Sequence, residues 1–171
     1  LLEPIPLPDS GELVVPEVIA PTGFQISLSI PNFKDWREKN RTFESFAANR
    51  RASRTLTGGD RPEVIVMREV LGDWFEALDV SAARGRVIAS DETWAGAAPI
   101  AVVTHGFWQR RLAGDPDVLG RTIVLDGESF EIVGVMPPDF RFPSADTEVF
   151  VPMGYYSERL CWEQRGCSQG T

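Results

Sequence analysis

Histidine and cysteine are scarce in this chain of 171 residues, which has one histidine, His105, and two cysteines, Cys161 and Cys167. The sequence contains neither a CxxC pair nor histidines at metal-ligand spacing, which argues against a zinc site or a thioredoxin-like redox site. The phosphate-binding patterns GxGxxG and GxxxxGK[ST] are also missing. We therefore predict that the chain holds no metal and no cofactor.

Positive charge is in short supply as well. The chain has 17 lysines and arginines against 25 aspartates and glutamates, a net charge of −8. This balance argues against nucleic acid as a partner and against adhesion to anionic lipid, because both need clustered cations. No apolar run approaches the ~20 residues that span a bilayer. The sequence has no signal peptide and does not begin with methionine, so we expect it to be a piece of a longer protein.

The most informative stretch is residues 99–152. Ile100 to Val103 is an apolar run of strand length, and Thr104 is placed to cap a helix that follows it. Residues 121–125 and 128–135 read as two strands separated by Asp126-Gly127, a pair that favours a two-residue hairpin turn. This turn predicts that Ile123 lies opposite Phe130, with Leu125 and Ile132 on the same buried face.

The upstream half alternates helix and strand signals. Ser29 and Pro31 predict the start of a helix, with Phe33 and Trp36 on one core-facing stripe. A break at Asn40 and a new cap at Thr42 predict that a further helical segment continues the apolar side with Phe43, Phe46 and Ala47. Two strands are expected at residues 50–57 and 64–71, and a short helix around Trp74, Phe75 and Leu78. The second strand is apolar on both faces except at Arg68 and Glu69, which favours a central place in a sheet.

Residues with catalytic potential are few. His105 falls at a helix start without a nucleophile motif, so we interpret it as a packing or capping residue rather than a general base. The neighbouring acids Asp91-Glu92 and Asp115/Asp117 match neither a hydrolase pair nor a calcium loop. Phe140, Arg141 and Phe142 follow a double proline. This trio either folds back over the hairpin or is offered to a partner or substrate.

One string carries a resemblance. HGFWQRRLAGDPDVLGRTIVLDGESFEIVGVMPPDFRFP is similar to the signature of the MacB-type periplasmic core domain, the extracytoplasmic part of FtsX-like ABC-transporter permeases. The sequence of this string resembles most that of the long duplicated orphan permeases. The resemblance extends upstream through IPNFKDWREKNRTFESFAA and PEVIVMREVLGDWFEALDVSAARGRVI, and residues 99–143 are its most specific part.

The resemblance implies an α+β fold: a two-lobed mixed α/β domain. Residues 1–83 would form a porter-like lobe, residues 84–152 a second lobe with the β-hairpin, and residues 153–171 a tail. Family members usually return a further strand and helix to the first lobe. The sequence stops before such a segment, so we expect an exposed sheet edge in that lobe.

The resemblance also implies a function. Such domains are not enzymes; they transmit ATP-driven movement of membrane helices to the periplasmic side of the bacterial inner membrane. The implied partners are a cytoplasmic ABC ATPase acting through the full-length permease, a periplasmic adaptor or lipoprotein, and a second copy of the domain. The oxidising compartment favours a Cys161–Cys167 disulfide over two free thiols. Two alternatives stay open: a secreted ligand-binding module, and a hydrolase that uses His105.

Overall fold

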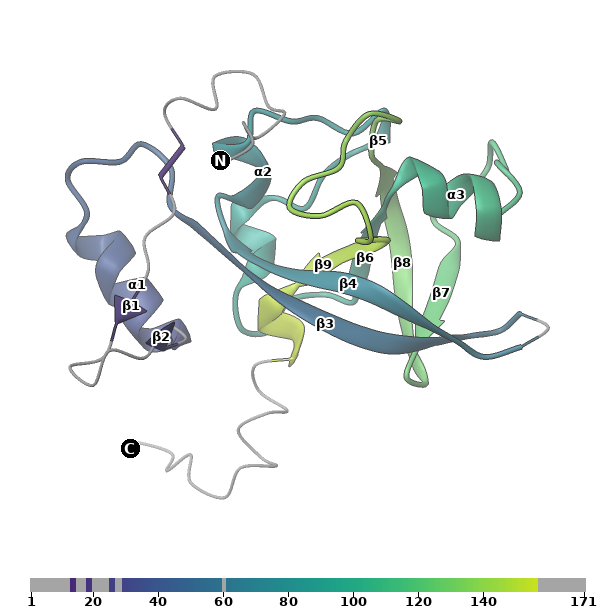
Figure 1. Cartoon of the computed structure of the whole chain (residues 1–171), viewed down its shortest axis with the longest axis horizontal. Coiled ribbons are helices and arrows are strands. Elements are labelled where there is room, and N and C mark those ends of the chain that lie inside the picture. The colour runs from purple at the N-terminus through teal and green to yellow at the C-terminus, as the bar shows by residue number, and fades with distance from the viewer. Residues whose placement is uncertain (1–12, 15–17, 20–24, 27–28, 60, 157–171) are drawn as a thin grey trace.

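The computed structural model describes residues 13–14, 18–19, 25–26, 29–59 and 61–156 (Figure 1). It is a mixed fold, as predicted. Its helices are α1 (Ile30–Lys39), α2 (Trp74–Ala77), the 3-10 turn η2 (Ser90–Thr93) and α3 (His105–Arg111). Its strands are β1 (Val18–Ile19), β2 (Gln25–Ile26), β3 (Ala47–Thr57), β4 (Glu63–Gly72), β5 (Arg84–Gly85), β6 (Ile100–Val103), β7 (Thr122–Leu125), β8 (Glu128–Val135) and β9 (Val149–Pro152).

Seven strands form one sheet in the order β5-β8-β6-β9-β4-β3-β7, and β7 also pairs with β8. This last pairing closes six of the strands into a ring, while β5 extends one edge of β8 and β1 pairs only with β2. The ring combines β3 and β4 with strands from residues 100–152. The division into lobes at residue 83 is not visible in this sheet and stays a prediction.

The interior of the ring is the main core. Side chains alternate along each strand, so every second residue points inward. The inward set is apolar and nearly inaccessible: Ile65, Met67, Ala101, Val103, Ile123, Leu125, Phe130, Ile132, Val149 and Val151. Phe107 and Trp108 of α3 belong to the same cluster. The predicted hairpin is confirmed: Ile123 pairs with Phe130, and the turn residues Asp126 and Gly127 have φ angles of 51° and 84°.

A second core covers the outer face of β4, β6 and β9. Trp74 and Phe75 of α2 pack there with Phe140 and Phe150. Both faces of β6 and β9 are therefore buried, and β4 lies between β9 and β3. The predicted central position of residues 64–71 is confirmed.

Helix α1 begins where the sequence predicts, because the Ser29 hydroxyl accepts a hydrogen bond from the Asn32 N–H at 3.3 Å. Phe33 is 2% exposed, but Trp36 is 40% exposed, so the prediction of a core-facing stripe is wrong for Trp36. The further helical segment predicted from Thr42 is also wrong. Residues 40–46 form a loop, and Ala47 begins β3.

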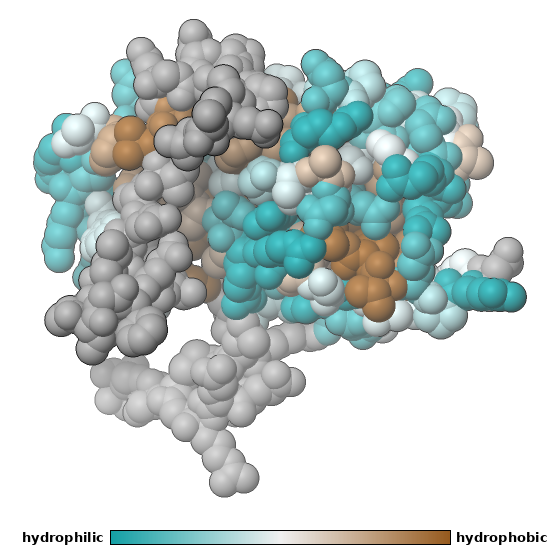
Figure 2. Space-filling view, in the orientation of Figure 1, coloured by the Kyte–Doolittle hydropathy of each residue, from teal (hydrophilic) through white to brown (hydrophobic). Residues whose placement is uncertain are grey.

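Most of the face in Figure 2 is hydrophilic, with apolar residues gathered beside α1 and in the region of β3 and β4. No helix within the described ranges has both the length and the apolar composition needed to cross a bilayer.

Gly134 and Gly59 give a matched test of the packing. A Cβ on Gly134 would collide with the backbone carbonyl of Arg86 where β5 meets β8, whereas a Cβ on Gly59 would have no described atom within 4 Å. We expect Gly134→Ala to lower the free energy of unfolding by about 2 kcal/mol, because neighbouring backbone must move. Gly59→Ala should leave it unchanged in the same urea titration. Equal stability of the two variants would contradict the close β5–β8 packing.

Candidate functional site

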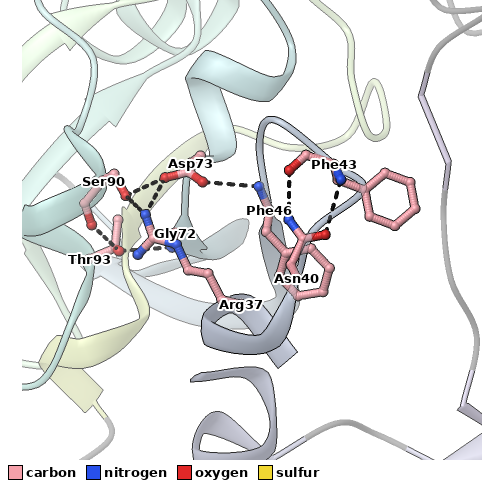
Figure 3. A network of polar contacts seen from close by, with 8 residues as sticks. All are labelled: Arg37, Asn40, Phe43, Phe46, Gly72, Asp73, Ser90 and Thr93. Carbon is pink, nitrogen blue, oxygen red and sulfur yellow. Dashed lines mark hydrogen bonds and ion pairs between the residues drawn. The ribbon is translucent and has the colours of Figure 1, made fainter. Parts of the chain in front are cut away.

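A network of polar contacts between distant segments joins α1 to the body of the molecule (Figure 3). Arg37, in the last turn of α1, donates through Nη2 to Asp73 Oδ1 at 2.7 Å and to Ser90 Oγ at 3.2 Å. Ser90 Oγ donates in turn to Asp73 Oδ1 at 2.6 Å. Asp73 directly follows β4, and Ser90 begins η2. We call the contact made by Arg37, Asp73 and Ser90 the α1 junction.

The same carboxylate also fixes the backbone around it. Asp73 Oδ2 accepts from the Phe46 N–H at 3.0 Å, so both oxygens of a side chain that is only 17% exposed are used. Beside it, the Gly72 N–H donates to Thr93 Oγ1 at 2.9 Å. Gly72 has φ +70°, and a Cβ there would lie 2.5 Å from the Phe46 carbonyl oxygen, so this close approach requires glycine.

Asn40 explains why the second helical segment does not form. Its Oδ1 accepts from the N–H groups of Thr42 and Phe43, both at 3.0 Å, and its Nδ2 donates to the Phe43 carbonyl at 2.6 Å (Figure 3). An asparagine side chain that binds nearby backbone in this way competes with helix hydrogen bonds. The result is a compact loop that leads into β3.

Aromatic side chains pack beside the α1 junction. Phe33 lies 5.1 Å from the Phe46 ring and 6.0 Å from the Trp94 ring, measured between centroids. The guanidinium of Arg37 lies over Trp94 at 5.4 Å, a cation–π distance. Trp94 is therefore half-buried by α1.

A surface cavity of about 480 Å³ adjoins the α1 junction and is lined by Arg37, Glu76, Ala89, Ser90, Asp91 and Trp94. The lining carries one cation, Arg37, and two carboxylates, Glu76 and Asp91, and the Arg37 guanidinium already lies over the Trp94 ring. Asp91, weighed in the sequence as one of a pair of acids, lies here. Its neighbour Glu92 instead binds Arg86 and the Ala89 N–H. Burial raises the pKa of Glu92, but these hydrogen bonds outweigh that effect and leave the pKa below its usual range.

A buried carboxylate inside the ring is the feature that the sequence reasoning missed. Glu69 is 0% exposed, and it binds Arg50, whose Nε lies 2.7 Å from Oε2, and Arg54 Nη2 at 3.3 Å. Arg54 also lies 3.3 Å from Asp126 and stacks over the Tyr156 ring at 4.8 Å. Burial is the main cause of the raised pKa of Tyr156. The predicted strands 50–57 and 64–71 indicated a hairpin, but pairing them end to end places Arg50 opposite Leu71, and only the observed register places it opposite Glu69.

The predicted contact trio lies at the edge of the second core. The Phe140 ring packs 5.9 Å from Phe150, and Phe142 stacks on Trp74 at 5.8 Å. Arg141 is exposed and donates to the Phe140 carbonyl at 3.0 Å. A contact between this trio and a partner stays a prediction.

Little in the described residues indicates catalysis. The His105 ring packs edge-on against Trp108, 5.3 Å away. Asp115 accepts from the Asp117 N–H and binds Arg121, which is the arrangement of a turn. No group of three or more His, Cys, Asp or Glu side chains in these ranges could hold a metal ion. Cys161 and Cys167 lie outside the described residues, so their disulfide stays a prediction.

The comparisons with known proteins agree with the resemblance read from the sequence. The model of the MacB-like periplasmic core domain family matches residues 4–168. No curated protein matches the chain.

Two solved structures share the fold. The periplasmic region of MacB from Actinobacillus actinomycetemcomitans has a TM-score of 0.62 at 14% identity, covering 78% of this chain and 59% of that one. The extracellular domain of the noncanonic ABC-type transporter YknZ from Gram-positive bacteria has a TM-score of 0.54 at 14% identity, covering 67% and 57%. The chain thus spans less than two thirds of each relative, and at this identity the likeness establishes the fold alone.

Substitution of Asp73 tests the α1 junction. Asp73→Ala leaves the Arg37 guanidinium and the Phe46 N–H without their acceptor, so we expect a loss of about 2 kcal/mol in the free energy of unfolding. Hydrogen exchange at the Phe46 amide should accelerate together with exchange in α1. Glu76→Ala, an exposed carboxylate on α2, is the control and should change neither quantity. Unchanged exchange in Asp73→Ala would show that the junction contributes little to holding α1.

Proposed function

Because this chain belongs to the family of MacB-like periplasmic core domains, we propose that it is the non-enzymatic extracytoplasmic domain of an ABC-transporter permease. It stands on the periplasmic side of the bacterial inner membrane and works with a cytoplasmic ATPase through the full-length permease. The match of the family model to residues 4–168 supports the non-enzymatic part of this proposal.

The α1 junction is the observation that carries the coupling part of this proposal. Arg37 bonds to Asp73 and Ser90, which lie 36 and 53 positions later in the chain. One side chain thus joins α1 to the residue that follows β4 and to η2. In related permeases the segment before this helix follows the first membrane helix. A displacement of that segment therefore reaches the body of the domain through α1, because α1 is tied to the body by Arg37 and by the Phe33 ring.

A second anchor lies at the other end of the described chain. The Tyr155 and Tyr156 rings lie 5.0 and 6.1 Å from Phe130 in the ring interior, and Tyr156 also contacts Arg54. In the family a further strand and helix follow this region and return to the first lobe before the second membrane helix. With one anchor near each end, the body moves as a unit when its membrane connections move.

A secreted ligand-binding module is the alternative function, and it would use the open surface cavity beside Trp94. The two functions differ in their prediction for the full-length gene product, because only the permease is held in the membrane. A periplasmic adaptor, a lipoprotein and a second copy of the domain remain proposed partners of the permease.

The location is tested by labelling. Glu131 is exposed on β8, so Glu131→Cys in a full-length protein whose other cysteines, Cys161 and Cys167 among them, are replaced by serine presents one thiol of known position. We expect a membrane-impermeant maleimide to label it in intact spheroplasts, and the protein to sediment with the membrane fraction. Labelling only after lysis would overturn the proposed location. Release of the unlabelled protein into the medium would favour the secreted module.

Coupling is tested with the same thiol. A donor dye on Glu131→Cys and acceptor dyes in the lipid headgroups report the position of the body above a reconstituted membrane. We expect the transfer efficiency to change when ATP binds the assembled transporter. Arg37→Ala should reduce that change by about half or more while ATP hydrolysis continues, because the link from α1 to the body is weakened.

Lys34→Ala, which removes an exposed pair with Glu38 on the same helix, is the control and should behave as wild type. No nucleotide-dependent change in the wild type would contradict coupling itself. An unaltered change in Arg37→Ala would contradict only the route through the α1 junction.

A further inference from the structure

The outer edge of β3 has the properties of a docking strand. The hydrogen bonds of Thr55 show which backbone groups of β3 point to this outer edge. The Thr55 N–H donates to Asp126 Oδ1 at 2.8 Å, and the Thr55 carbonyl accepts from the Asp126 N–H at 2.9 Å. Thr55 therefore faces away from β4. Since backbone groups alternate along a strand, those of Ser53, Arg51 and Asn49 face the same way.

These outward groups are largely unused. β7 pairs with β3 only at Leu56 and Thr57, and no other described strand pairs with this edge. The Ser53 carbonyl accepts from Arg54 Nη1 at 3.0 Å, which leaves the N–H and carbonyl groups of Arg51 and Asn49 without a backbone partner among the described residues. β3 is the lower border of the β3–β4 ribbon in Figure 1. Such a row of groups is a template for an added strand.

Charge determines which strand fits. Four arginines lie at this edge, Arg50, Arg51, Arg54 and Arg68, against the three carboxylates Glu69, Asp126 and Asp146. The pKa of Arg68 is lowered mainly by burial and further by the neighbouring Arg51, while Asp146 acts in the opposite direction. This local excess stands out in a chain of net charge −8.

The arginines reach both faces of an incoming strand. Arg50 points to the ring side, where it binds Glu69, and Arg51 points to the outer side, where it binds Asp146. Their side chains are 46% and 51% exposed, so both heads are accessible. An acidic residue on either face of an added strand would thus meet an arginine as its cross-strand neighbour.

The same charges disfavour a second copy of this chain. In the antiparallel registers that overlap two β3 edges most fully, Arg50 or Arg51 of one copy would lie opposite the same arginine of the other, and like charges directly opposite are destabilising. We propose that the β3 edge at residues 47–53 binds an extended, acidic polypeptide segment of a partner protein by strand addition. This inference does not depend on the membrane coupling proposed above.

Hydrogen exchange provides the first test, on the whole chain. The amides of Asn49, Arg51 and Ser53 should exchange rapidly, whereas those of Arg50 and Ala52, which face β4, should be protected. Protection of the outward amides in the isolated protein would overturn the proposal, because the edge would already be occupied.

Peptides provide the second test. The acidic hexapeptide TEVEVT should shift the NMR signals of residues 47–55, with binding that weakens as salt rises, and the basic TKVKVT should not bind. Arg51→Pro removes an outward N–H and should weaken binding of TEVEVT about tenfold or more. Arg51→Glu should reverse the preference between the two peptides, and Arg61→Glu, an equal charge change in the β3–β4 turn, should not.

Three results would overturn the proposal. These are no binding of TEVEVT, equal binding of both peptides, and binding that is indifferent to Arg51→Pro and Arg51→Glu. Self-association of the wild type that Arg51→Pro abolishes would assign the edge to a second copy instead.

Discussion

The pairing between Thr55 and Asp126 is the contact on which the rest of the structure depends. The tip of the β7–β8 hairpin meets β3 there through two hydrogen bonds of 2.8 and 2.9 Å, and Arg54 adds an ion pair to the same carboxylate. This contact turns a twisted sheet into a closed ring. The closed ring encloses Phe130 and Ile132, and Glu69 is buried in its interior while the two arginines that bind it keep part of their side chains exposed. A buried carboxylate of this kind is tolerated only when its charge is matched by hydrogen-bonded cations.

Several arginines of this acidic chain form ion pairs within the molecule. Arg37 holds α1, Arg50 and Arg54 neutralise Glu69, and Arg110 pairs with Glu148. These arginines therefore join segments that are distant in the sequence. The β3 edge is the place where cations outnumber carboxylates, which is why it stands apart from the rest of the surface.

Local signals in the sequence predicted the local structure well. Asp126-Gly127 set the hairpin register, Thr104 and Ser29 capped their helices, and the apolar run at residues 64–71 became a central strand. These features depend on neighbours a few residues away. The helical segment expected from Thr42 failed because the Asn40 side chain captures the very amides that a helix start would leave free. The prediction that Trp36 faces the core was wrong for a different reason. The spacing of apolar residues shows which face of a helix is apolar, but not whether another element covers that face.

Contacts between distant segments could not be predicted from the sequence alone. Nothing near Arg37 indicates that Asp73 and Ser90 will meet it, and nothing in β7 indicates that β3 will close the ring. The family resemblance supplied the fold class but not these side chains. Glu69 is intermediate, because the two strands that carry it and Arg50 were predicted, while their register and the burial of Glu69 were not.

The position of β9 has a consequence for the order in which the chain folds. β9 lies between β4 and β6, and its Val149 pairs with Met67 of β4 in parallel. The two strands are separated by most of the described chain, so this pairing has a high sequence separation and forms slowly. Until residues 149–152 have been synthesised, the edges of β4 and β6 that β9 will cover stay unpaired, and the apolar side chains of the ring cannot be fully enclosed. Strand β9 therefore completes the ring that the described strands form, and a chain delivered across a membrane from its N-terminus would reach the far side before this ring can close.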